Sequence, residues 1–332
     1  MDYVYPKLSA IDLNITRIGG LGLGNMLFPY ARAVLYARDH HLPLIWPTWN
    51  SIPAGQILRR EKNKRFYHDL FTPKDAAVKD VSGENRLRVI TGAEKNWLRM
   101  SRKHISEHDL SEQHILEQNI LKGDRIIEFS GMEGEFAPLL GKENGTWLYE
   151  HLKSILQVKN RKALEFQPGK AVCMHVRLGD FTRMNGSGQT DEQKEKWEEA
   201  LRSGLPNLSI PLEWYVDLVR QIRKKLGYEI HVYVFSDGTD TELETLLSLS
   251  GVERKTFGTA IADIMALAQA KLFIASGSTF SRWVRYLGQM NTITYPGQLG
   301  QKLLEKDAGT FETEVVQLSD EILGDIYAQM AE

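Results

Sequence analysis

Cysteine is nearly absent from this chain of 332 residues, in which Cys173 is the only one. A single cysteine cannot form an intrachain disulfide, and it cannot supply the thiolates of a structural zinc site or an iron–sulfur cluster. Because Cys173 lies within the apolar run AVCMHV, we expect it to be a small buried hydrophobic residue.

Long hydrophobic runs and an excess of positive charge are also missing. No segment approaches the ~18 consecutive apolar residues of a membrane-spanning helix. Residues 1–14 lack the positive leader and apolar stretch of a secretory signal. The formal net charge is −2, so no basic field is available to bind nucleic acid. We therefore expect a cytoplasmic protein that neither spans a membrane nor binds nucleic acid.

The length and the apolar pattern predict an α/β protein with two domains. A chain of this length exceeds what one hydrophobic core usually serves. Segments typical of strands alternate with amphipathic helical segments, and strands that are apolar throughout indicate a mostly parallel sheet covered on both faces. We expect residues 1–165 to form an N-terminal domain and residues 166–332 a C-terminal domain, with a last helix that can pack back on the first domain.

In the first domain the expected order is strand, helix, strand. The alternating apolar residues Ile11, Leu13, Ile15 and Ile18 predict the first strand. Apolar residues at helical spacing from Leu27 predict a helix, with Asn25 as its N-cap and Pro29 near its first turn. The segments LPLIW at residues 42–46 and RIIEFSG at residues 125–131 are typical of further strands.

In the second domain the predicted strands are longer and more continuous. They lie at residues 170–176, 229–236, 271–276 and 291–295, with the last of these closing the sheet. The segment PLEWYVDLVRQIRKKLG predicts a helix that ends at Gly227. The charged segment at residues 188–204 is expected to run over the surface.

A glycine-rich turn, GGLGLGN at residues 19–25, precedes the first helix and can bring backbone close to a ligand. A dinucleotide-binding fingerprint needs a further glycine and, about twenty residues later, an acidic residue. Met26, Leu27 and Phe28 stand where that glycine is needed, and the second strand ends at Trp46 without an acid. This argues against a dehydrogenase. A tight strand-to-helix turn explains the glycines equally well.

Two polar groups follow apolar strands of the second domain, where open α/β sheets bind ligands. In MHVRLGD, Arg177 can hold a phosphate through paired charged hydrogen bonds, although an ion pair at a strand end is the alternative. In the other group, Asp263 opens a helix, and the strand KLFIAS leads into Ser276, Ser278 and Thr279 before the next helix. Hydroxyls and free N–H groups at a helix N-terminus favour phosphate, while helix capping is the simpler interpretation.

Metal-ligand spacing is not recognisable in the sequence. Asp237 and Asp240, in VFSDGTD, are not an Asp-x-Asp pair, and Asp-Gly favours a turn. His40 and His41 lack the i, i+4 spacing of zinc ligands on a helix. We expect no metal site and no cofactor.

Taken in order, these motifs resemble the bacterial α-1,2-fucosyltransferase family (glycosyltransferase family 11) and its α-1,6- and protein O-fucosyltransferase relatives. The family opens with G-G-L-G-N-Q-x-F-x-Y-A, which GLGNMLFPYA at residues 22–31 resembles. Its signature H-x-R-R-x-D is matched by His175, Arg177 and Asp180. Its later motif D-x-x-L-x-x-x-x-x-x-I-x-x-x-S-S-F-S-W-W is similar to residues 263–283, and YVFSD lies between them. The chain departs from these motifs at Leu178, Met26 and Arg282.

The resemblance implies a GT-B-like fold, in which two Rossmann-like lobes face each other across a cleft. The N-terminal lobe would lie on the acceptor side and the C-terminal lobe would bind the nucleotide sugar. The implied activity is inverting transfer of fucose from GDP-fucose to a glycan hydroxyl, without metal, in surface polysaccharide synthesis. A lipid-linked acceptor would give peripheral membrane contact.

The resemblance also implies roles for individual residues. Arg177 would bind the β-phosphate, His175 and Asp263 would contact the guanine side, and Asn25 would reach the phosphate or the acceptor. The donor site would be completed by Gly22, Gly24, Ser278, Thr279 and the N–H of Phe280. The catalytic residues would be Arg177, Asp180 and Asn25. Asp180, Glu133 and Glu135 are the candidate general bases.

Two other interpretations remain open. Leu178 in place of the second signature arginine leaves the donor undecided, so a transferase of the same fold could use another nucleotide sugar. A catalytically silent glycan-binding protein would carry the same motifs. The acceptor, the linkage and the oligomeric state are not encoded in a recognisable pattern.

Overall fold

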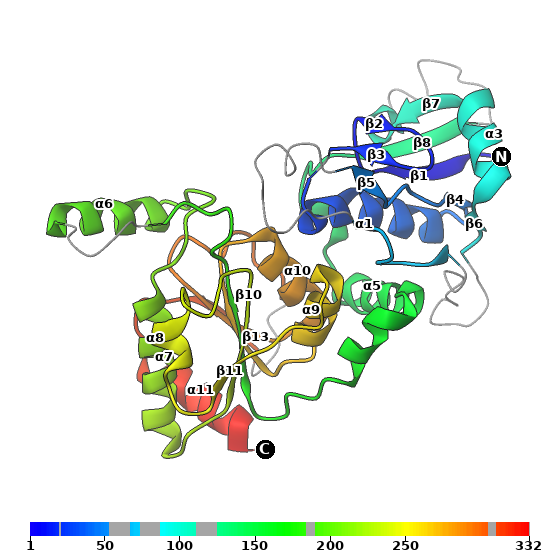
Figure 1. The fold of residues 1–332 in the computed structure, drawn as a ribbon. Helices are drawn as coiled ribbons and strands as arrows, with labels where there is room; N and C mark the ends of the chain where they lie inside the picture. The colour runs from blue at the N-terminus through cyan, green and yellow to red at the C-terminus, as the bar shows by residue number, and fades with distance from the viewer. Residues whose placement is uncertain are drawn as a thin grey trace. The chain divides into compact units, whose positions relative to one another are not determined.

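In the computed structural model the chain folds into two compact units, Met1–Arg161 and Lys162–Glu332 (Figure 1). The structure describes residues 1–19, 21–52, 67–73, 87–110, 125–183, 190–304 and 310–331. Each unit has its own main sheet, and all neighbouring strands within these two sheets run parallel. The predicted α/β class with two Rossmann-like units is confirmed.

The main sheet of the first unit has the order β6-β4-β1-β8-β7. Its central strand β1 pairs with β8 along its whole length, from Tyr3 opposite Ile126 to Lys7 opposite Ser130. The strands are β1 (Tyr3–Lys7), β4 (Leu44–Ile45), β6 (Val89–Ile90), β7 (Lys103–Ser106) and β8 (Arg125–Ser130). β4 and β8 match the strands predicted at residues 42–46 and 125–131.

The first strand was predicted in the wrong place. β1 occupies residues 3–7, whereas residues 11–18 form a short hairpin of β2 (Ile11–Asp12) and β3 (Arg17–Ile18), which β5 (Ser51–Ile52) extends. The hairpin inverts the expected burial: its apolar side chains at positions 11, 13, 15 and 18 are exposed, while Arg17 is fully buried. Alternation alone predicts two faces, and here the polar face is the one turned inward.

Helix α1 (Leu23–Asp39) packs against β1 and β8, as the helical spacing predicted. It begins three residues earlier than expected, with Gly22 in place of Asn25 as its N-cap, so Asn25 is the third residue of the helix. The prediction of Asn25 as N-cap was therefore wrong. Pro29 consequently lies in the second turn, where it has no N–H to donate to the carbonyl of Asn25.

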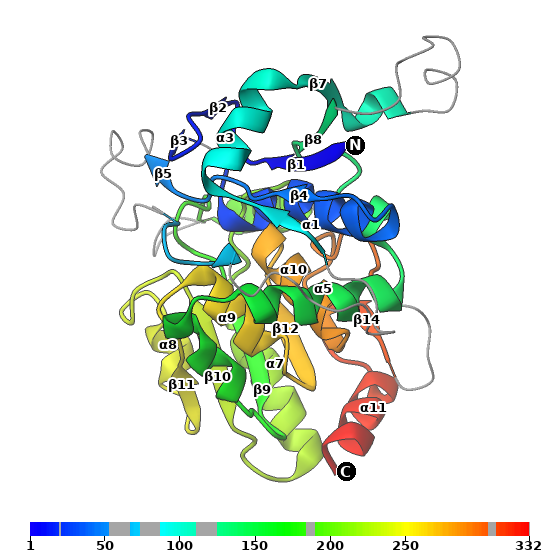
Figure 2. The same cartoon turned by 90° about the vertical axis from the view of Figure 1, so that its right-hand side faces the viewer.

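The opposite face of this sheet is covered by α3 (Gly92–Ser101), whose Leu98 packs with Tyr5, Ile45, Ile90 and Ile126 (Figure 2). Helix α5 (Lys142–Ile155) packs on α1. The described part of this unit also contains the 3-10 helices η2 (Glu107–Leu110), η3 (Ala137–Leu139) and η4 (Val158–Glu165), the last of which crosses into the second unit. Much of the weakly periodic middle region, and Gly20 of the glycine-rich turn, lie outside the described residues.

The sheet of the second unit has the order β11-β10-β9-β12-β13-β14. Numbered along the chain, this is 3-2-1-4-5-6, the order of dinucleotide-binding folds, and the direction of winding reverses between β9 and β12. The strands are β9 (Val172–Val176), β10 (Val232–Ser236), β11 (Val252–Arg254), β12 (Leu272–Ala275), β13 (Asn291–Thr294) and β14 (Glu312–Glu314). β14 corrects the prediction that the strand at residues 291–295 is the last.

Alternate side chains of strand β9 point to opposite faces of this sheet. Val172, Met174 and Val176 pack into the core formed with α7 (Leu212–Leu226), α8 (Glu244–Leu247) and α11 (Asp320–Ala331). Cys173 and His175 point to the other face, which carries α9 (Ala260–Leu267) and α10 (Thr279–Gly288). Cys173 is fully buried, which confirms its prediction as a small hydrophobic residue, and burial raises the pKa of its thiol to about 12.

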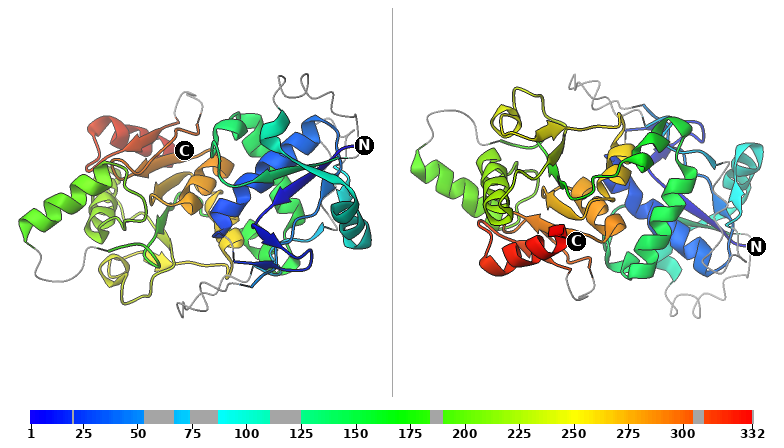
Figure 3. Two further views of the ribbon diagram at one scale, coloured as in Figure 1. Left: turned by 90° about the horizontal axis from the view of Figure 1, so that it is seen from above. Right: turned by 90° about the horizontal axis from the view of Figure 1, so that it is seen from below.

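Helix ends in this unit follow their capping residues. Gly227 ends α7 in the left-handed region at φ 77°, as predicted. The last helix, α11, packs on α7. The charged segment after residue 188 contains α6 (Asp191–Arg202), which Thr190 and Gln193 begin with a capping box and which extends away from the sheet (Figure 3). Among the described helices, none combines the length and the apolar character needed to cross a membrane.

Candidate functional site

Polar side chains converge in the second unit where β9 and β12 end, at the reversal of the strand order. β9 delivers His175 and then the loop that carries Arg177 and Asp180. β12 is followed by Ser276 and Ser278, which lead into α10. Because ligands of open α/β sheets bind at the carboxyl ends of the strands beside such a reversal, this is the candidate site of the unit.

His175 joins the two strand ends. Its Nδ1 lies 3.0 Å from Ser276 Oγ and 2.8 Å from Ser281 Oγ, and its ring stacks on Phe280 at 4.3 Å between centroids. Burial lowers the pKa of His175 to about 3, so the ring is neutral near pH 7. Only 4% of the residue is exposed. In this arrangement His175 fixes the start of α10 relative to β9, and its contact with a nucleobase stays a prediction.

The serine cluster serves the helix as well as the site. Ser278 is the N-cap of α10, and its Oγ accepts a hydrogen bond from the N–H of Ser281 at 3.3 Å. Ser276 Oγ lies 3.0 Å from both Ser278 Oγ and Ser281 Oγ. Capping, the simpler interpretation of this motif, is therefore present. Thr279 and Phe280 are the first two residues of α10, where backbone N–H groups have no intrahelical acceptor.

Arg177 is held between two carboxylates. Its Nη2 forms an ion pair with Asp180 and its Nη1 with Asp237. The second oxygen of Asp237 accepts a hydrogen bond from the N–H of Leu178 at 2.9 Å. The ring of Phe181 lies 5.3 Å from the guanidinium carbon. The ion pair that the sequence left as an alternative for Arg177 is thus formed.

This pairing does not exhaust the hydrogen-bonding capacity of Arg177. A guanidinium has five N–H donors, and two of them are used by the two carboxylates. The remaining three have no acceptor within the described residues, and 21% of the side chain is exposed. Arg177 can therefore accept a further anion while one carboxylate keeps it oriented.

Asp237 is the site residue that sequence reasoning missed, because its Asp-Gly sequence was interpreted as a turn. The signal lies in the strand register. Ser236 at the end of β10 pairs with Val176 at the end of β9, so the residues that follow the two strands are neighbours. Neighbouring parallel strands end at a common edge of the sheet, and this general rule places Asp237 beside Arg177.

Asp263 lies in the first turn of α9 and fixes the loop after β11. Its Oδ1 accepts a hydrogen bond from the N–H of Phe257 at 2.5 Å, and its Oδ2 accepts one from Thr256 Oγ1 at 3.1 Å. Burial raises the pKa of Asp263 to about 6, although both hydrogen bonds favour the charged form. A carboxyl that changes its charge close to neutral pH is therefore present at this edge of the sheet.

The other predicted site residues belong to the first unit. Gly22 caps α1, and Gly24 is buried inside it. Asn25 has a buried Oδ1 with no hydrogen-bond partner among the described residues, so its carboxamide is an unused acceptor. Oε2 of Glu133 lies 2.6 Å from Nε2 of His108, and Glu135 has a positive φ of 42°.

Asp237 and Asp240 do not form a joint site. Asp237 is engaged by Arg177 and Leu178, and Asp240 pairs with Arg254. In the part of the chain that the structure describes, no group of three or more histidine, cysteine, aspartate or glutamate side chains is arranged to hold a metal ion.

No protein family and no curated protein matches the sequence. Solved structures with a similar fold include the α-1,6-fucosyltransferase NodZ soaked with GDP-fucose, at 16% identity over 88% of this chain and 94% of that chain, with a TM-score of 0.46. NodZ from Bradyrhizobium is 15% identical over the same shares, with a TM-score of 0.48. POFUT1 in complex with GDP is 13% identical over 86% of this chain and 99% of that chain, with a TM-score of 0.42. The strand order and register establish the α/β fold independently of these similarities.

Proposed function

We propose that the chain is a glycosyltransferase that moves fucose from GDP-fucose to a glycan hydroxyl with inversion. In this proposal it needs neither metal nor cofactor, and it acts in the cytoplasm in surface polysaccharide synthesis. The observation that carries the proposal is Arg177, a partly exposed guanidinium with unused donors, in the loop after β9, the strand whose His175 contacts the first turn of α10 at the reversal of a 3-2-1-4-5-6 sheet.

The chemistry of this edge suits a sugar diphosphate. A planar guanidinium binds two phosphate oxygens at once, and the N-terminus of a helix adds backbone N–H donors and a partial positive charge. When the bond from the sugar C1 to the β-phosphate oxygen breaks, negative charge grows on that phosphate. Arg177 and the N–H groups of Thr279 and Phe280 would stabilise this charge.

The two carboxylates would act differently when the donor binds. Asp237 is fixed by the N–H of Leu178, so it would keep Arg177 oriented. The side chain of Asp180 is 45% exposed, against 26% for Asp237, so a phosphate oxygen would replace Asp180 on the guanidinium. Binding of the donor would thereby release the Asp180 carboxylate next to the reacting centre.

The released carboxylate is our candidate for the general base. The acceptor hydroxyl would attack C1 from the face opposite the leaving phosphate and pass its proton to Asp180, with Glu133 and Glu135 as the other candidates. A single displacement of this kind inverts the configuration at C1. Asn25, His175, Asp263, Ser278, Gly22 and Gly24 keep the supporting roles that the family resemblance implies.

A donor screen tests the proposal. Calorimetry with GDP-fucose, GDP-mannose and UDP-sugars should give binding with GDP-fucose foremost, and product analysis with a glycan acceptor should detect transferred fucose. Binding of a different nucleotide sugar would support the same fold with another donor. Binding of glycans without any nucleotide binding or GDP release would indicate a catalytically silent protein and would contradict the proposal.

A further inference from the structure

A cavity of about 270 Å³ lies in the first unit, and none of the candidate site residues named above is among those that line it. Its walls come from three segments that follow strands of the first unit: Asn14 after β2, Trp46 to Asn50 after β4, and Thr91 after β6. Since β4 and β6 belong to the parallel sheet, the cavity lies at the carboxyl ends of these strands, where this architecture binds ligands. Its volume is just below that of pockets for drug-sized ligands, which suits a single sugar ring.

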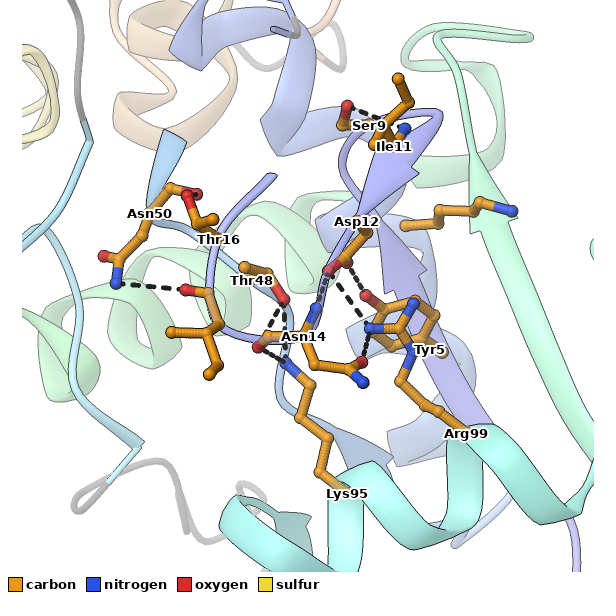
Figure 4. A network of polar contacts seen from close by, with 12 residues as sticks. Tyr5, Ser9, Ile11, Asp12, Asn14, Thr16, Thr48, Asn50, Lys95 and Arg99 are labelled. Carbon is orange, nitrogen blue, oxygen red and sulfur yellow. Dashed lines mark hydrogen bonds and ion pairs between the residues drawn. The ribbon is translucent and has the colours of Figure 1, made fainter. Parts of the chain in front are cut away.

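The floor of the cavity contains a buried ammonium group with an unused donor. Lys95, on α3, is 6% exposed, and its Nζ donates to Thr48 Oγ1 at 3.0 Å and to Asn14 O at 3.2 Å (Figure 4). An ammonium has three N–H donors, so one remains without an acceptor in the described part of the chain. A ligand oxygen at this point would satisfy it.

A second buried donor lines the same cavity. Trp49 is 5% exposed, and its indole Nε1–H has no acceptor within the described residues. The Nε1 atom is closed to solvent, and the indole packs on the rings of Tyr30 and Phe71 at 5.2 and 4.5 Å between centroids, so Trp49 forms the aromatic wall behind the cavity. Trp46 is half-buried and adds a second indole to the wall.

The walls are held rigidly by the network shown in Figure 4. Asp12 accepts hydrogen bonds from the hydroxyl of Tyr5 and the N–H of Asn14, and Arg99 pairs with Asp12 at 3.2 Å. Arg99 also binds the side chain of Asn14, whose carbonyl accepts from Lys95. The loop of the hairpin is therefore fixed before any ligand arrives, which reduces the entropy cost of binding.

The charges of the lining favour a neutral ligand. Lys95 and Asp69 are the charged residues among those that form the cavity, and their formal charges cancel. A phosphate or carboxylate ligand would meet the Asp69 carboxylate, and the nearby cation Lys159 is already paired with that carboxylate at 3.2 Å. A sugar ring combines hydroxyl groups for Lys95, Asp69 and the asparagines with apolar C–H faces for the indoles.

We propose that this cavity binds one sugar ring of the acceptor glycan. The identification of that sugar as the acceptor rests on the proposed function, whereas the binding of a sugar here does not. The proposal assigns Lys95 as a hydrogen-bond donor to the ring and Trp46 as the indole against which the ring packs, with Trp49 in the wall behind them as a reporter of binding.

The test follows the indole N–H resonances of ¹⁵N-tryptophan-labelled full-length protein. The probes are the methyl glycosides of glucose, galactose, mannose, N-acetylglucosamine and N-acetylgalactosamine, added without nucleotide. At least one glycoside should shift the Trp49 resonance in a saturable manner. Trp46→Ala should weaken that binding at least tenfold, whereas Trp97→Ala, an exposed tryptophan of α3 outside the cavity, should leave the affinity unchanged.

Lys95→Met removes the buried donor, and Asn50→Ala changes an exposed residue of the rim with less risk to folding. Both should weaken glycoside binding while GDP-fucose binding, measured on the same preparations, stays as in the parent protein. No shift of Trp49 with any glycoside, or a shift with inorganic phosphate instead, would overturn the inference. If the parent protein does not bind GDP-fucose, the proposed function is refuted. Failure of the sugar-site proposal and failure of the proposed function therefore give different results.

Discussion

Arg177 and Asp237 form an ion pair across adjacent strand ends, and the same carboxylate accepts the N–H of Leu178 through its other oxygen. The backbone of the loop after β9 therefore holds the carboxylate that orients the arginine of the same loop. An arginine fixed in this way can stabilise a developing charge without reorganising when the reaction occurs, which is the property that makes electrostatic stabilisation effective.

Arg177→Ala should lower kcat by at least ~10²-fold, the loss expected for one group that stabilises transition-state charge. Arg177→Lys should recover little of it, because an ammonium cannot reproduce the planar fork. Arg220→Ala is the matched control, since it removes an arginine that is ion-paired with Asp217 on the surface of α7. Melting temperature and kcat are measured on the same preparations. If Arg177→Ala remains folded and nearly as active as the parent, Arg177 has only a structural role.

The two partners of Arg177 should respond differently to loss of charge. Asp180→Asn should reduce kcat strongly while GDP binds as well or better, because a competing negative charge is gone. Asp237→Asn should weaken GDP binding and lower the melting temperature, because the guanidinium loses the carboxylate that fixes it. Calorimetry with GDP and initial-rate kinetics on both variants check this. Equal effects of both substitutions on both quantities would refute the proposed exchange of partners.

Chelation should leave turnover intact. In the proposed mechanism the charge on the leaving phosphate is stabilised by Arg177 and backbone N–H groups, so EDTA should change kcat less than twofold. The assay compares untreated protein, EDTA-treated protein and treated protein supplied with Mg²⁺ or Mn²⁺. Activity that disappears with EDTA and returns with either ion would require a metal in the mechanism.

Asp263 should make folding stability fall as the pH rises through weakly acidic values. Its folded-state pKa is about 6 against an ordinary value of 3.8, so the folded state binds the proton more tightly between these values. The free energy of unfolding therefore decreases from about pH 4 to about pH 6 by at most about 3 kcal/mol, at ~1.4 kcal/mol per pKa unit.

The Asp263→Asn variant isolates this contribution. The difference in melting temperature, variant minus parent, should increase from about pH 4 to about pH 6 and level off above about pH 7. Buried His175 and His151 have pKa values lowered to about 3, so their contribution to stability increases with pH over the acidic range. Because both proteins contain these histidines, their contribution cancels in the difference between the two melting temperatures. A difference in melting temperature that does not depend on pH would show that the pKa of Asp263 is not raised in the folded state.

The second unit was largely predictable because its central strands are buried on both faces. Strands β9, β10 and β12 are four or five residues of nearly continuous apolar character, a pattern that few other structures produce. The polar residues at and after the ends of these strands, His175, Arg177 and Ser278, were therefore recognisable in the sequence as one candidate site. The outer strands β11 and β14 are three residues each, too short for a period to be recognised.

The first unit shows why pattern alone failed there. β1 contains Pro6, and a proline argues against a strand with neighbours on both sides. Its pairing with β4 is recorded only at Val4 and Leu44, so Pro6 lies beyond the end of that ladder. The hairpin that pairs Ile11 with Ile18 has the alternating apolar pattern of a half-buried strand. Its polar side nevertheless faces inward, where Asp12 and Arg17 hold it through hydrogen bonds. Side-chain pairing of this kind is a tertiary property that no local window contains.

Cys173, the only cysteine of the chain, lies in the middle of β9, so its reactivity can report opening of the second unit. Its thiol lies on the face of the sheet that carries α9 and α10, with none of its surface exposed. A thiol reagent can reach it only when the sheet of the second unit opens, so the rate of modification measures the frequency of that opening. For the same reason, a cysteine introduced on the surface would be labelled alone. A pair of such cysteines, one in each unit, would let fluorescence energy transfer follow the distance between the units during turnover, with the native sequence otherwise untouched.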